Sequence, residues 1–574
     1  MTARDVAKVL YDIETLLQLH GGDEMKSKAY GRAARALETS TIDIEAAARS
    51  GKIDVPGIGK TMGAEVMEIV ETGTTAARDE LLAATPPGLL EILKIRGLGA
   101  KKVRALHQSL GVESLEELEQ AAIGNRIAGL AGFGKKSQEN ILAGIAELGS
   151  AQSKFRINVA MPAGEQILGV LEGLPSVERA SLAGRLRRGA EEYEYLSFVV
   201  QSAAPETVTA ELGGTGLLSD VALDGNCITG ITQEGYPVKI YVAGAENFVT
   251  VLHQRTGAGD YAFILSIPLA DRGYDLREEG LFRDGAPVLL NTEEELFELA
   301  GTQFIPPEIR EGIDEVRSAL DDGVPELVRE DHLRGMLHVH STWSDGRSSI
   351  ADIAEHVRGL GYRYLLITDH SKTAYYANGL DENRLERQGM EIDELNKQYD
   401  PAEFRVLKGI ECDILGDGTL DLSDDALAAL DAVVISVHSR FSMPMEAQTE
   451  RICRALENPY ATILGHSTGR LILKRKGYDV DLKSVIDTAA AHGKCIELNC
   501  NPMRLDLNWR MVRHARRKGV PIAINPDAHS LADFGNMRYG VTMARKGWLT
   551  PDGTLNALDA DGFLKFVAGT RKGM

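Results

Sequence analysis

The sequence has 574 residues, of which 44% are hydrophobic and 26% are charged, and its formal net charge is −21 at pH 7; a chain of this length predicts roughly three to five domains. Its five cysteines include no CxxC pair, which excludes a disulfide framework and favours a reducing compartment. The amino terminus has no signal-peptide core and no run reaches about 18 apolar residues, so we expect a monomeric, cytoplasmic protein without a membrane partner.

Three short segments in the first third of the chain share a Gly-apolar-Gly turn followed by lysine: PGIGK at 56–60, GLGAKK at 97–102 and AGFGKK at 131–136. Glycine permits a tight turn, and the start of the following helix offers unpaired N–H groups to a phosphate. The segments resemble helix-hairpin-helix motifs, which bind nucleic-acid backbone without reading its sequence. The residues predicted to bind DNA are Gly57, Gly59, Lys60, Gly97, Gly99, Lys101, Lys102, Gly132, Gly134, Lys135 and Lys136.

The overall negative charge would argue against such a partner, but the charge is unevenly distributed. Residues 1–150 contain 18 Lys and Arg against 21 Asp and Glu, a net charge of −3, which leaves −18 for residues 151–574. A nearly neutral region can still present a local basic face to phosphates. DNA therefore remains the expected partner.

Further segments extend the resemblance over most of the chain. They are MKSKAYGRAARALE at 25–38, GRLRRG at 184–189, QRTGAGDY at 254–261 and FIPPEIRE at 304–311. In this order they look like the body of a bacterial family X DNA polymerase with a C-terminal PHP (polymerase and histidinol phosphatase) domain. The resemblance implies a helical domain with the first hairpin (1–82), a fingers-like helix-hairpin-helix region (83–150), an α+β nucleotidyltransferase palm (151–244), a thumb-like domain (245–320) and a PHP domain (331–574).

The resemblance fails where nucleotide transfer needs it. The family carries two aspartates, one residue apart, on a palm strand and a third on a later strand, and the matching positions here are Tyr195, Ser197 and Lys239. Two magnesium ions need carboxylates to hold them across a triphosphate. Glu194 would point to the opposite face of an alternating strand. We predict that polymerase activity has been lost.

Residues 331–574 alternate between strand-like and helix-like segments. Short apolar runs predict strands at 336–339, 364–368, 406–410, 432–437, 461–464, 495–498 and 520–525. Helix-like segments at 349–360, 482–492 and 509–518 fall between them, which predicts a seven-stranded parallel α/β barrel whose strand ends converge on one face. Nine side chains with metal-ligand chemistry follow these runs: His338, His340, Asp345, His370, Glu411, His438, His466, Asp527 and His529. Mixed imidazole and carboxylate ligation favours Mn, Zn or Fe, and nine ligands suffice for about three ions.

The strings LHVHSTWSDG at 337–346, TDH at 368–370, GIECDIL at 409–415, SVHSRF at 436–441, GHSTGR at 465–470 and DAHS at 527–530 look like the PHP family. That resemblance implies a trinuclear site that hydrolyses phosphate esters. It groups His338, His340, Glu411 and Asp527 on one ion, Glu411, His438 and His466 on a second, and Asp345, His370 and His529 on the third. Arg440, Arg470 and Arg504 follow the same strand ends, and we predict that they bind the phosphate.

These observations predict a DNA-binding, metal-dependent phosphoesterase, either a 3′–5′ exonuclease or an abasic-site nuclease in DNA repair. One alternative is an active family X polymerase, which primer extension would reveal. Another is a phosphatase of the histidinol-phosphatase type, which the hairpin repeats disfavour.

Overall fold

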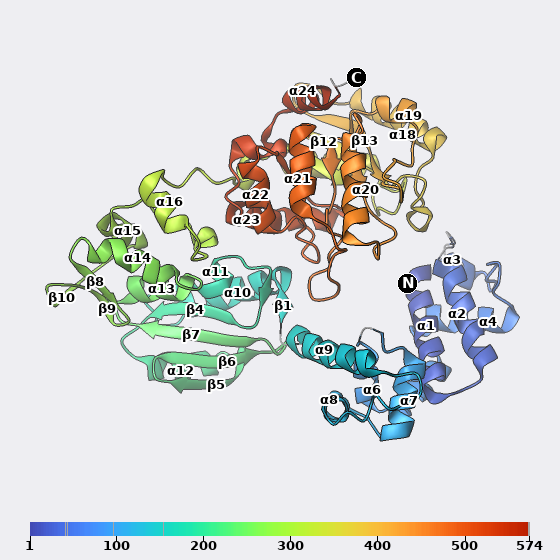
Figure 1. The fold of residues 1–574 in the computed structure, drawn as a ribbon, viewed down its shortest axis with the longest axis horizontal. Helices are drawn as coiled ribbons and strands as arrows, with labels where there is room; N and C mark the ends of the chain where they lie inside the picture. Colours follow the sequence, from blue (N-terminus) through green and yellow to red (C-terminus); the bar gives the residue numbers. More distant parts are fainter. Residues whose placement is uncertain (39, 41, 43, 96, 153, 572–574) are drawn as a thin grey trace. The chain divides into compact units, whose positions relative to one another are not determined.

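The computed structural model describes residues 1–574 except 39, 41, 43, 96, 153 and 572–574. The chain divides into two compact units, Met1–Ser153 and Lys154–Met574, and the elements of both are labelled in Figure 1. Among the described residues, no helix is both long enough and apolar enough to cross a membrane.

The described part of the first unit is helical. Its helices are α1 (Ala3–His20), α2 (Glu24–Glu38), α3 (Ile44–Arg49), α4 (Lys60–Thr72), α5 (Ala76–Ala83), α6 (Pro87–Ile92), α7 (Ala100–Leu110), α8 (Leu115–Ile123) and α9 (Lys135–Gln152). A capping box between Thr2 and Asp5 starts α1, because the two side chains satisfy backbone N–H groups that the helix leaves unpaired. The apolar faces of α1 to α4 enclose one core, and those of α6 to α9 enclose another. The predicted helical region is confirmed.

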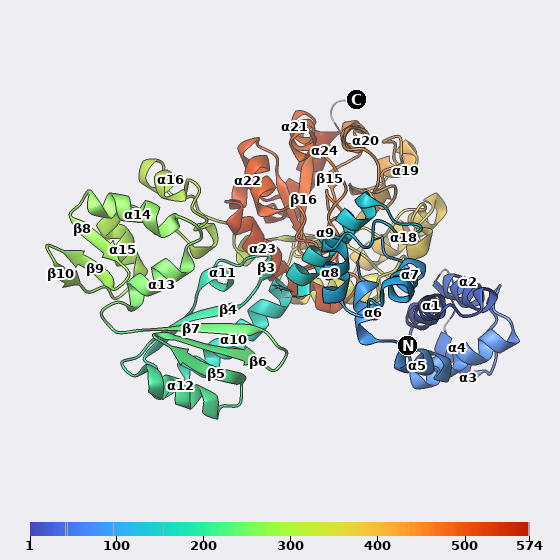
Figure 2. The ribbon, with the colours of Figure 1, turned by 60° about the horizontal axis from the view of Figure 1, so that its bottom comes forward.

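The second unit begins with an α+β region. A five-stranded sheet has the order β2 (Arg179–Leu182), β4 (Leu196–Gln201), β7 (Pro237–Ala243), β6 (Cys227–Thr232) and β5 (Leu218–Asp224). Strands β4 and β7 are parallel, and the other neighbours are antiparallel. The remaining elements are β1 (Phe155–Arg156), α10 (Ile157–Glu172), α11 (Gly184–Arg187), β3 (Glu192–Tyr193) and α12 (Pro205–Gly214). Helices α10 and α12 lie beside the sheet in Figure 2, and their apolar residues share a core with it, as expected for a palm.

A thumb-like region follows the palm. It contains α13 (Phe248–Thr256), α14 (Tyr261–Ala270), β8 (Tyr274–Arg277), β9 (Gly280–Arg283), β10 (Ala286–Val288), α15 (Glu293–Ala300), η1 (Pro307–Ile309) and α16 (Glu315–Asp321). The buried carboxylate of Glu293 accepts hydrogen bonds of 2.5 Å from Arg310 of the thumb and from Arg187 of α11. A buried charge needs such partners, so this triad fixes the thumb against the palm.

The rest of the second unit is a barrel of seven parallel strands, in chain order β11 (Gly335–Val339), β12 (Tyr364–Ile367), β13 (Arg405–Asp413), β14 (Ala432–Ser436), β15 (Ile463–Leu464), β16 (Cys495–Asn499) and β17 (Ile522–Asn525). A bridge between Val339 and Ala528 nearly closes it. Helices flank the strands: η2 (Glu330–His332), α17 (Ile350–Gly359), η3 (Tyr375–Ala377), α18 (Glu382–Asn396), α19 (Asp424–Ala428), α20 (Met445–Glu457), α21 (Leu482–Ala491), α22 (Trp509–Arg517), η4 (Leu531–Asn536), α23 (Met537–Lys546), η5 (Pro551–Gly553), η6 (Leu555–Ala557) and α24 (Ala560–Thr570).

The barrel confirms the predicted fold class, and each predicted strand is present within two or three residues of its expected bounds. Strands buried on both faces read as continuous apolar runs, which is why short runs of Val, Ile and Leu located them. One strand differs: β13 continues through Glu411 to Asp413. Glu411 therefore lies within a strand, instead of just after it.

Helix α23 attaches the barrel to the palm and thumb. Arg538 pairs with Glu165 of α10, and Arg545 pairs with Glu308 of η1, each at 2.6 Å. Lys546, which is 3% exposed, donates to Glu311. These contacts hold the palm, the thumb and the barrel together within the second unit.

Candidate metal centre and DNA-binding elements

The nine predicted ligands converge at the carboxyl ends of the barrel strands. Three of them adopt left-handed backbone conformations, with φ of +58° at His338, +20° at His466 and +51° at Asp527. Non-glycine residues adopt this region rarely and at some cost, and such residues cluster at functional sites. The unusual backbone conformation at these strand ends therefore supports a functional site there.

Ligand atoms of the nine side chains come close enough to form four overlapping groups. The groups are His340, Asp345, His370 and His529; His338, His340 and Asp527; His338, Glu411 and His466; and His370, Glu411 and His438. In each group the ligand atoms lie within 4.8 Å of one another. The described residues therefore contain clusters that could bind metal.

Glu411 is the centre of the arrangement. Its Oε1 lies 2.9 Å from Nε2 of His466 and 3.3 Å from Nε2 of both His338 and His438. Its Oε2 lies 2.9 Å from Nδ1 of His370. Four imidazoles thus surround one buried carboxylate, and Glu411 lies at the centre of the candidate ligands.

A second carboxylate, Asp527, serves the other side of the site. Its Oδ1 lies 3.2 Å from Nε2 of His340 and 3.6 Å from Nε2 of His338. Asp345 Oδ1 lies 3.4 Å from Nε2 of His529 and 3.7 Å from Nε2 of His370. Each of these two carboxylates thus lies close to two imidazoles.

The groups by distance differ in two respects from the predicted division among three ions. His340 joins the Asp345 group as well as the Asp527 group, and Glu411 appears with His466 in one group and with His438 in another. Sequence spacing assigns ligands to strands, but it does not determine which imidazoles face each other across the barrel.

Several of these buried atoms make no hydrogen bond, including both ring nitrogens of His340, Nε2 of His338 and Nδ1 of His466. An unsatisfied buried polar atom is costly unless something binds it. Neutral imidazole nitrogens and carboxylate oxygens suit Mn, Zn or Fe. The residues present therefore fit bound divalent metal.

The protonation states of two candidate ligands, His340 and Glu411, agree with this fit. Burial, together with the imidazoles of His529 and His370, lowers the pKa of His340 to about 3. Burial would raise the pKa of Glu411, but His438, His338 and His370 hold it well below its ordinary value. His340 is therefore neutral and Glu411 ionised near pH 7, the forms that coordinate metal.

A layer of buried partners orients the ligands. Nδ1 of His338 donates to Glu497, which also accepts from Asn499 at 3.0 Å and from Asn525 at 2.9 Å. Nδ1 of His438 donates to Asp413 at 2.8 Å. Such contacts fix the tautomer and direction of a ligating histidine. We did not predict a role for Glu497, although a charged residue inside the apolar run 495–498 was a signal.

The three predicted arginines lie in different environments. The guanidinium of Arg470 contacts both carboxylate oxygens of Glu191 in the palm, at 2.8 and 3.1 Å, and its Nε donates to the carbonyl of Arg504 at 2.8 Å. The Arg470 guanidinium is therefore paired within the protein, and its contact with a phosphate stays a prediction. Arg504 Nε lies 3.8 Å from Asp527 Oδ2, beside the ligands, and Arg440 is exposed with φ of +57°.

The three hairpins have one geometry. The first glycine of each turn has a positive φ, +92° at Gly57, +86° at Gly97 and +84° at Gly132. An added Cβ at any of the six turn glycines would meet no atom within 4 Å, so the turns lie open at the surface. Helices α4, α7 and α9 begin directly after them, and all five predicted lysines are exposed.

Comparison with known proteins agrees with this layout. The sequence matches the helix-hairpin-helix domain over residues 1–75, the SAM-like helix-hairpin-helix tandem over 89–147, the DNA polymerase beta thumb over 251–311 and the PHP domain over 336–501. It is 36% identical over 573 residues to the DNA polymerase/3′–5′ exonuclease PolX of Bacillus subtilis (strain 168), an alignment that covers 98% of this chain and all of that protein. The chain belongs to the PolX family. The hairpin and thumb domains indicate DNA binding.

Other relatives match part of this PolX-family chain. A probable phosphatase of Thermoanaerobacter sp. (strain X514) is 27% identical over 227 residues, covering 36% of this chain and 90% of that protein. A probable phosphatase of Caldanaerobacter subterraneus subsp. tengcongensis is 28% identical over 230 residues, covering 37% of this chain and 83% of that protein. The PHP barrel of this PolX-family member thus resembles free-standing enzymes, which is consistent with a metal-dependent hydrolase.

The three altered palm positions meet in space. Ser197 is the register partner of Lys239 across β4 and β7, and the Lys239 ammonium lies 4.4 Å from the centroid of the Tyr195 ring. A cation over an aromatic ring is a stable arrangement. Glu192 and Glu194 instead face Lys154, at 3.3 and 3.8 Å.

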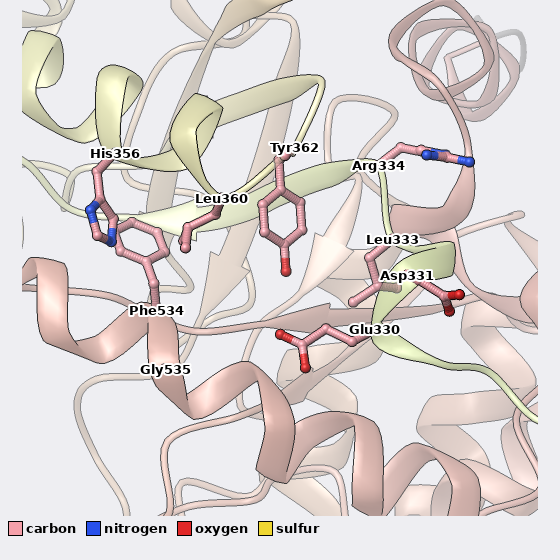
Figure 3. Close-up of a pocket in the computed structure, with 10 residues that line it drawn as sticks. Glu330, Asp331, Leu333, Arg334, His356, Leu360, Tyr362, Phe534 and Gly535 are labelled. Atoms are coloured by element: carbon pink, nitrogen blue, oxygen red, sulfur yellow. The ribbon is translucent and has the colours of Figure 1, made fainter.

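A separate cavity of about 320 Å³ lies beside the barrel. In Figure 3 the side chains of Tyr362 and Glu330 point toward one another across it, with His356 and Phe534 at one end. No candidate ligand lines it. Its lining residues Arg334 and Tyr362 precede β11 and β12, whereas the metal ligands lie at the other ends of the strands.

Proposed function

We propose that this PolX-family protein is a metal-dependent DNA phosphodiesterase that removes nucleotides from the 3′ end in DNA repair, and that its palm no longer polymerises. The observation that carries the proposal is the convergence of nine candidate ligand side chains with Glu411 at their centre, several with buried nitrogen atoms that make no hydrogen bond. The B. subtilis relative supports the choice of substrate, because its name includes a 3′–5′ exonuclease.

The proposed ligands are His338, His340, Asp345, His370, Glu411, His438, His466, Asp527 and His529, and nine ligands suffice for about three Mn, Zn or Fe ions. Ions bound in such a site neutralise the phosphate charge and lower the pKa of bound water. Glu411 holds four imidazoles in place from its position inside β13. Arg504, beside Asp527, and the exposed Arg440 are placed to contact the anionic oxygens of the substrate.

The hairpins of the first unit supply DNA affinity in this proposal. Their open turns and helix starts present backbone N–H groups to phosphates, and the adjacent lysines add positive charge without reading sequence. The phosphatase relatives match only the barrel. A polymeric substrate explains why this chain carries hairpins in addition.

Loss of synthesis follows from the palm. Lys239 presents a cation, and Tyr195 and Ser197 supply no carboxylate, where nucleotidyl transfer requires bound magnesium. The nearest acidic groups, Glu192 and Glu194, are paired with Lys154. We therefore expect purified protein to give no primer extension with Mg²⁺ or Mn²⁺, with the B. subtilis relative as the positive control.

The central test is degradation of a 5′-labelled oligonucleotide, alongside measurement of bound metal. His340→Ala should abolish hydrolysis but leave DNA affinity largely unchanged, because an imidazole is lost from the site while the hairpins are intact. His356→Ala, at the separate cavity, is the matched control and should retain hydrolysis. An unchanged rate in His340→Ala would overturn the assignment of the site. A substrate with an internal abasic position distinguishes end-directed from abasic-site cleavage.

A further inference from the structure

Two neighbouring tyrosines are displayed beside the candidate metal centre. Tyr375 and Tyr376 are 83% and 51% exposed, on the loop that follows His370. The ring centroid of Tyr376 lies 6.3 Å from that of His370. Exposed aromatic side chains that lie next to each other mark surfaces that bind partners.

The loop that carries them is held firmly. Its two ends are joined by a hydrogen bond of 2.7 Å from the Leu380 N–H to the His370 carbonyl, and Ser371 Oγ donates to Asp421 at 2.9 Å. At Gly379 an added Cβ would lie 1.9 Å from the Ser371 carbonyl oxygen. A loop packed this closely presents its tyrosines in one place.

A third ring lies on the loop that follows another proposed ligand, His438. Phe441 is 36% exposed and stacks on Tyr478, with centroids 5.8 Å apart and planes inclined by 15°. The Tyr478 hydroxyl donates to the carbonyl of Ser467 at 2.8 Å, next to the proposed ligand His466. Two different ligand loops of the barrel thus carry exposed aromatic rings.

A basic hairpin packs against this ring. Lys474, Arg475 and Lys476 are all exposed, and the Arg475 guanidinium lies 4.8 Å from the centroid of Phe441. Backbone hydrogen bonds of 2.8 Å in both directions between Leu471 and Arg475 close the hairpin. Residues 151–574 carry a net charge of −18, so these adjacent cations stand out against an acidic background.

We propose that Tyr375, Tyr376 and Phe441, with the hairpin at 474–476, form a subsite for the unpaired nucleotides that flank the scissile phosphate. The inference rests on the proposed DNA hydrolysis. The rings stack on bases and the cations contact backbone phosphates, the combination by which proteins hold single strands. Stacking requires unpaired bases, so the subsite admits a single-stranded end and resists a paired one.

The test compares two oligonucleotides that differ only in the last three residues at the 3′ end, which carry bases in one and abasic spacers in the other. The parent protein should have a KM about tenfold lower for the strand with bases, with a similar kcat. Tyr375→Leu should lose that preference by raising KM for the strand with bases alone. Tyr375→Phe should restore it, because the ring remains. Met390→Ala, a 59% exposed apolar side chain on α18, is the control and should behave like the parent.

Charge is tested separately. Lys474→Gln combined with Lys476→Gln should reduce the salt dependence of single-strand binding by about 1.4 in the slope of log K against log salt, about 0.7 for each contact. An unchanged slope would remove the hairpin from the subsite. Equal KM values for the two oligonucleotides in the parent would overturn the stacking proposal. Failure of the metal-loaded parent to hydrolyse either strand would instead overturn the proposed function.

Discussion

The barrel and the palm, the two regions of this chain that resemble catalytic domains, present opposite chemistry at their strand ends. In the barrel, seven further candidate ligands surround Glu411 and Asp527. In the palm, the matching positions hold a tyrosine whose ring lies beneath the lysine ammonium and a serine that pairs in register with that lysine. The palm sheet has five strands and a buried apolar core. Apolar packing holds such a sheet, so the palm fold does not depend on carboxylates at these three positions.

The strongest test of this difference between barrel and palm is to remove the central carboxylate of the barrel. We expect Glu411→Gln to reduce DNA hydrolysis by at least about 1,000-fold, because loss of the bridging charge weakens metal binding and the charge neutralisation that metal supplies. Lys239→Gln, the matched change in the palm, should leave hydrolysis unchanged. Single-turnover rates and metal content of both variants decide the matter. A large loss in Lys239→Gln would mean that the palm takes part in hydrolysis.

A smaller effect is expected one layer outside the ligands. Glu497→Gln keeps the shape of the side chain but weakens its contact with Nδ1 of His338, so metal affinity should fall about 10- to 100-fold. Titration of metal-free protein with Mn²⁺ or Zn²⁺ measures this directly. Glu450→Gln, on the outer helix α20, is the control. Unchanged affinity in Glu497→Gln would show that the charge of Glu497 does not contribute to metal binding through His338.

The hairpins test whether DNA affinity is separate from catalysis. Gly97→Val combined with Gly99→Val should weaken DNA binding about tenfold, the size expected for loss of a charge-assisted hydrogen bond, while hydrolysis of a small phosphodiester persists. Gly111→Val is a matched control, because Gly111 also has a positive φ, +67°, and open space, but it caps the other end of α7. Equal loss in the control would point to backbone strain instead of phosphate contact.

The smallest expected effect concerns the bond that joins the two regions. The side chains of Arg470 and Glu191 are 20% and 19% exposed, and a double-mutant cycle with Arg470→Gln and Glu191→Gln should give a coupling of about 1–2 kcal/mol in the free energy of unfolding. Chemical denaturation of the four proteins measures it. Additive effects would show that the palm and barrel are held together by α23 and not by this pair.

Much of the fold was predictable because it depends on local patterns. Buried parallel strands show as short runs of Val, Ile and Leu, and a Gly-apolar-Gly turn before lysine marks each hairpin. The sequence pattern predicts less well where a strand ends. The strand that contains Glu411 continues for three residues beyond its apolar run, because the barrel supplies hydrogen-bond partners that the run itself does not reveal.

The sequence by itself identified the side chains proposed to carry the chemistry: nine candidate ligands at strand ends, the turn glycines and lysines, and three palm positions without carboxylates. Only the tertiary structure decided which of these residues contact each other. Closing the barrel brings Glu497 to His338, 159 residues earlier, and packing the palm on the barrel brings Glu191 to Arg470, 279 residues later. Spacing along a chain encodes periodicity, whereas contacts between distant residues depend on how whole elements pack. This is why the sequence could name the candidate ligands that the structure brings together, while their division among ions stays a prediction and the contact of Arg470 with Glu191 was not foreseen.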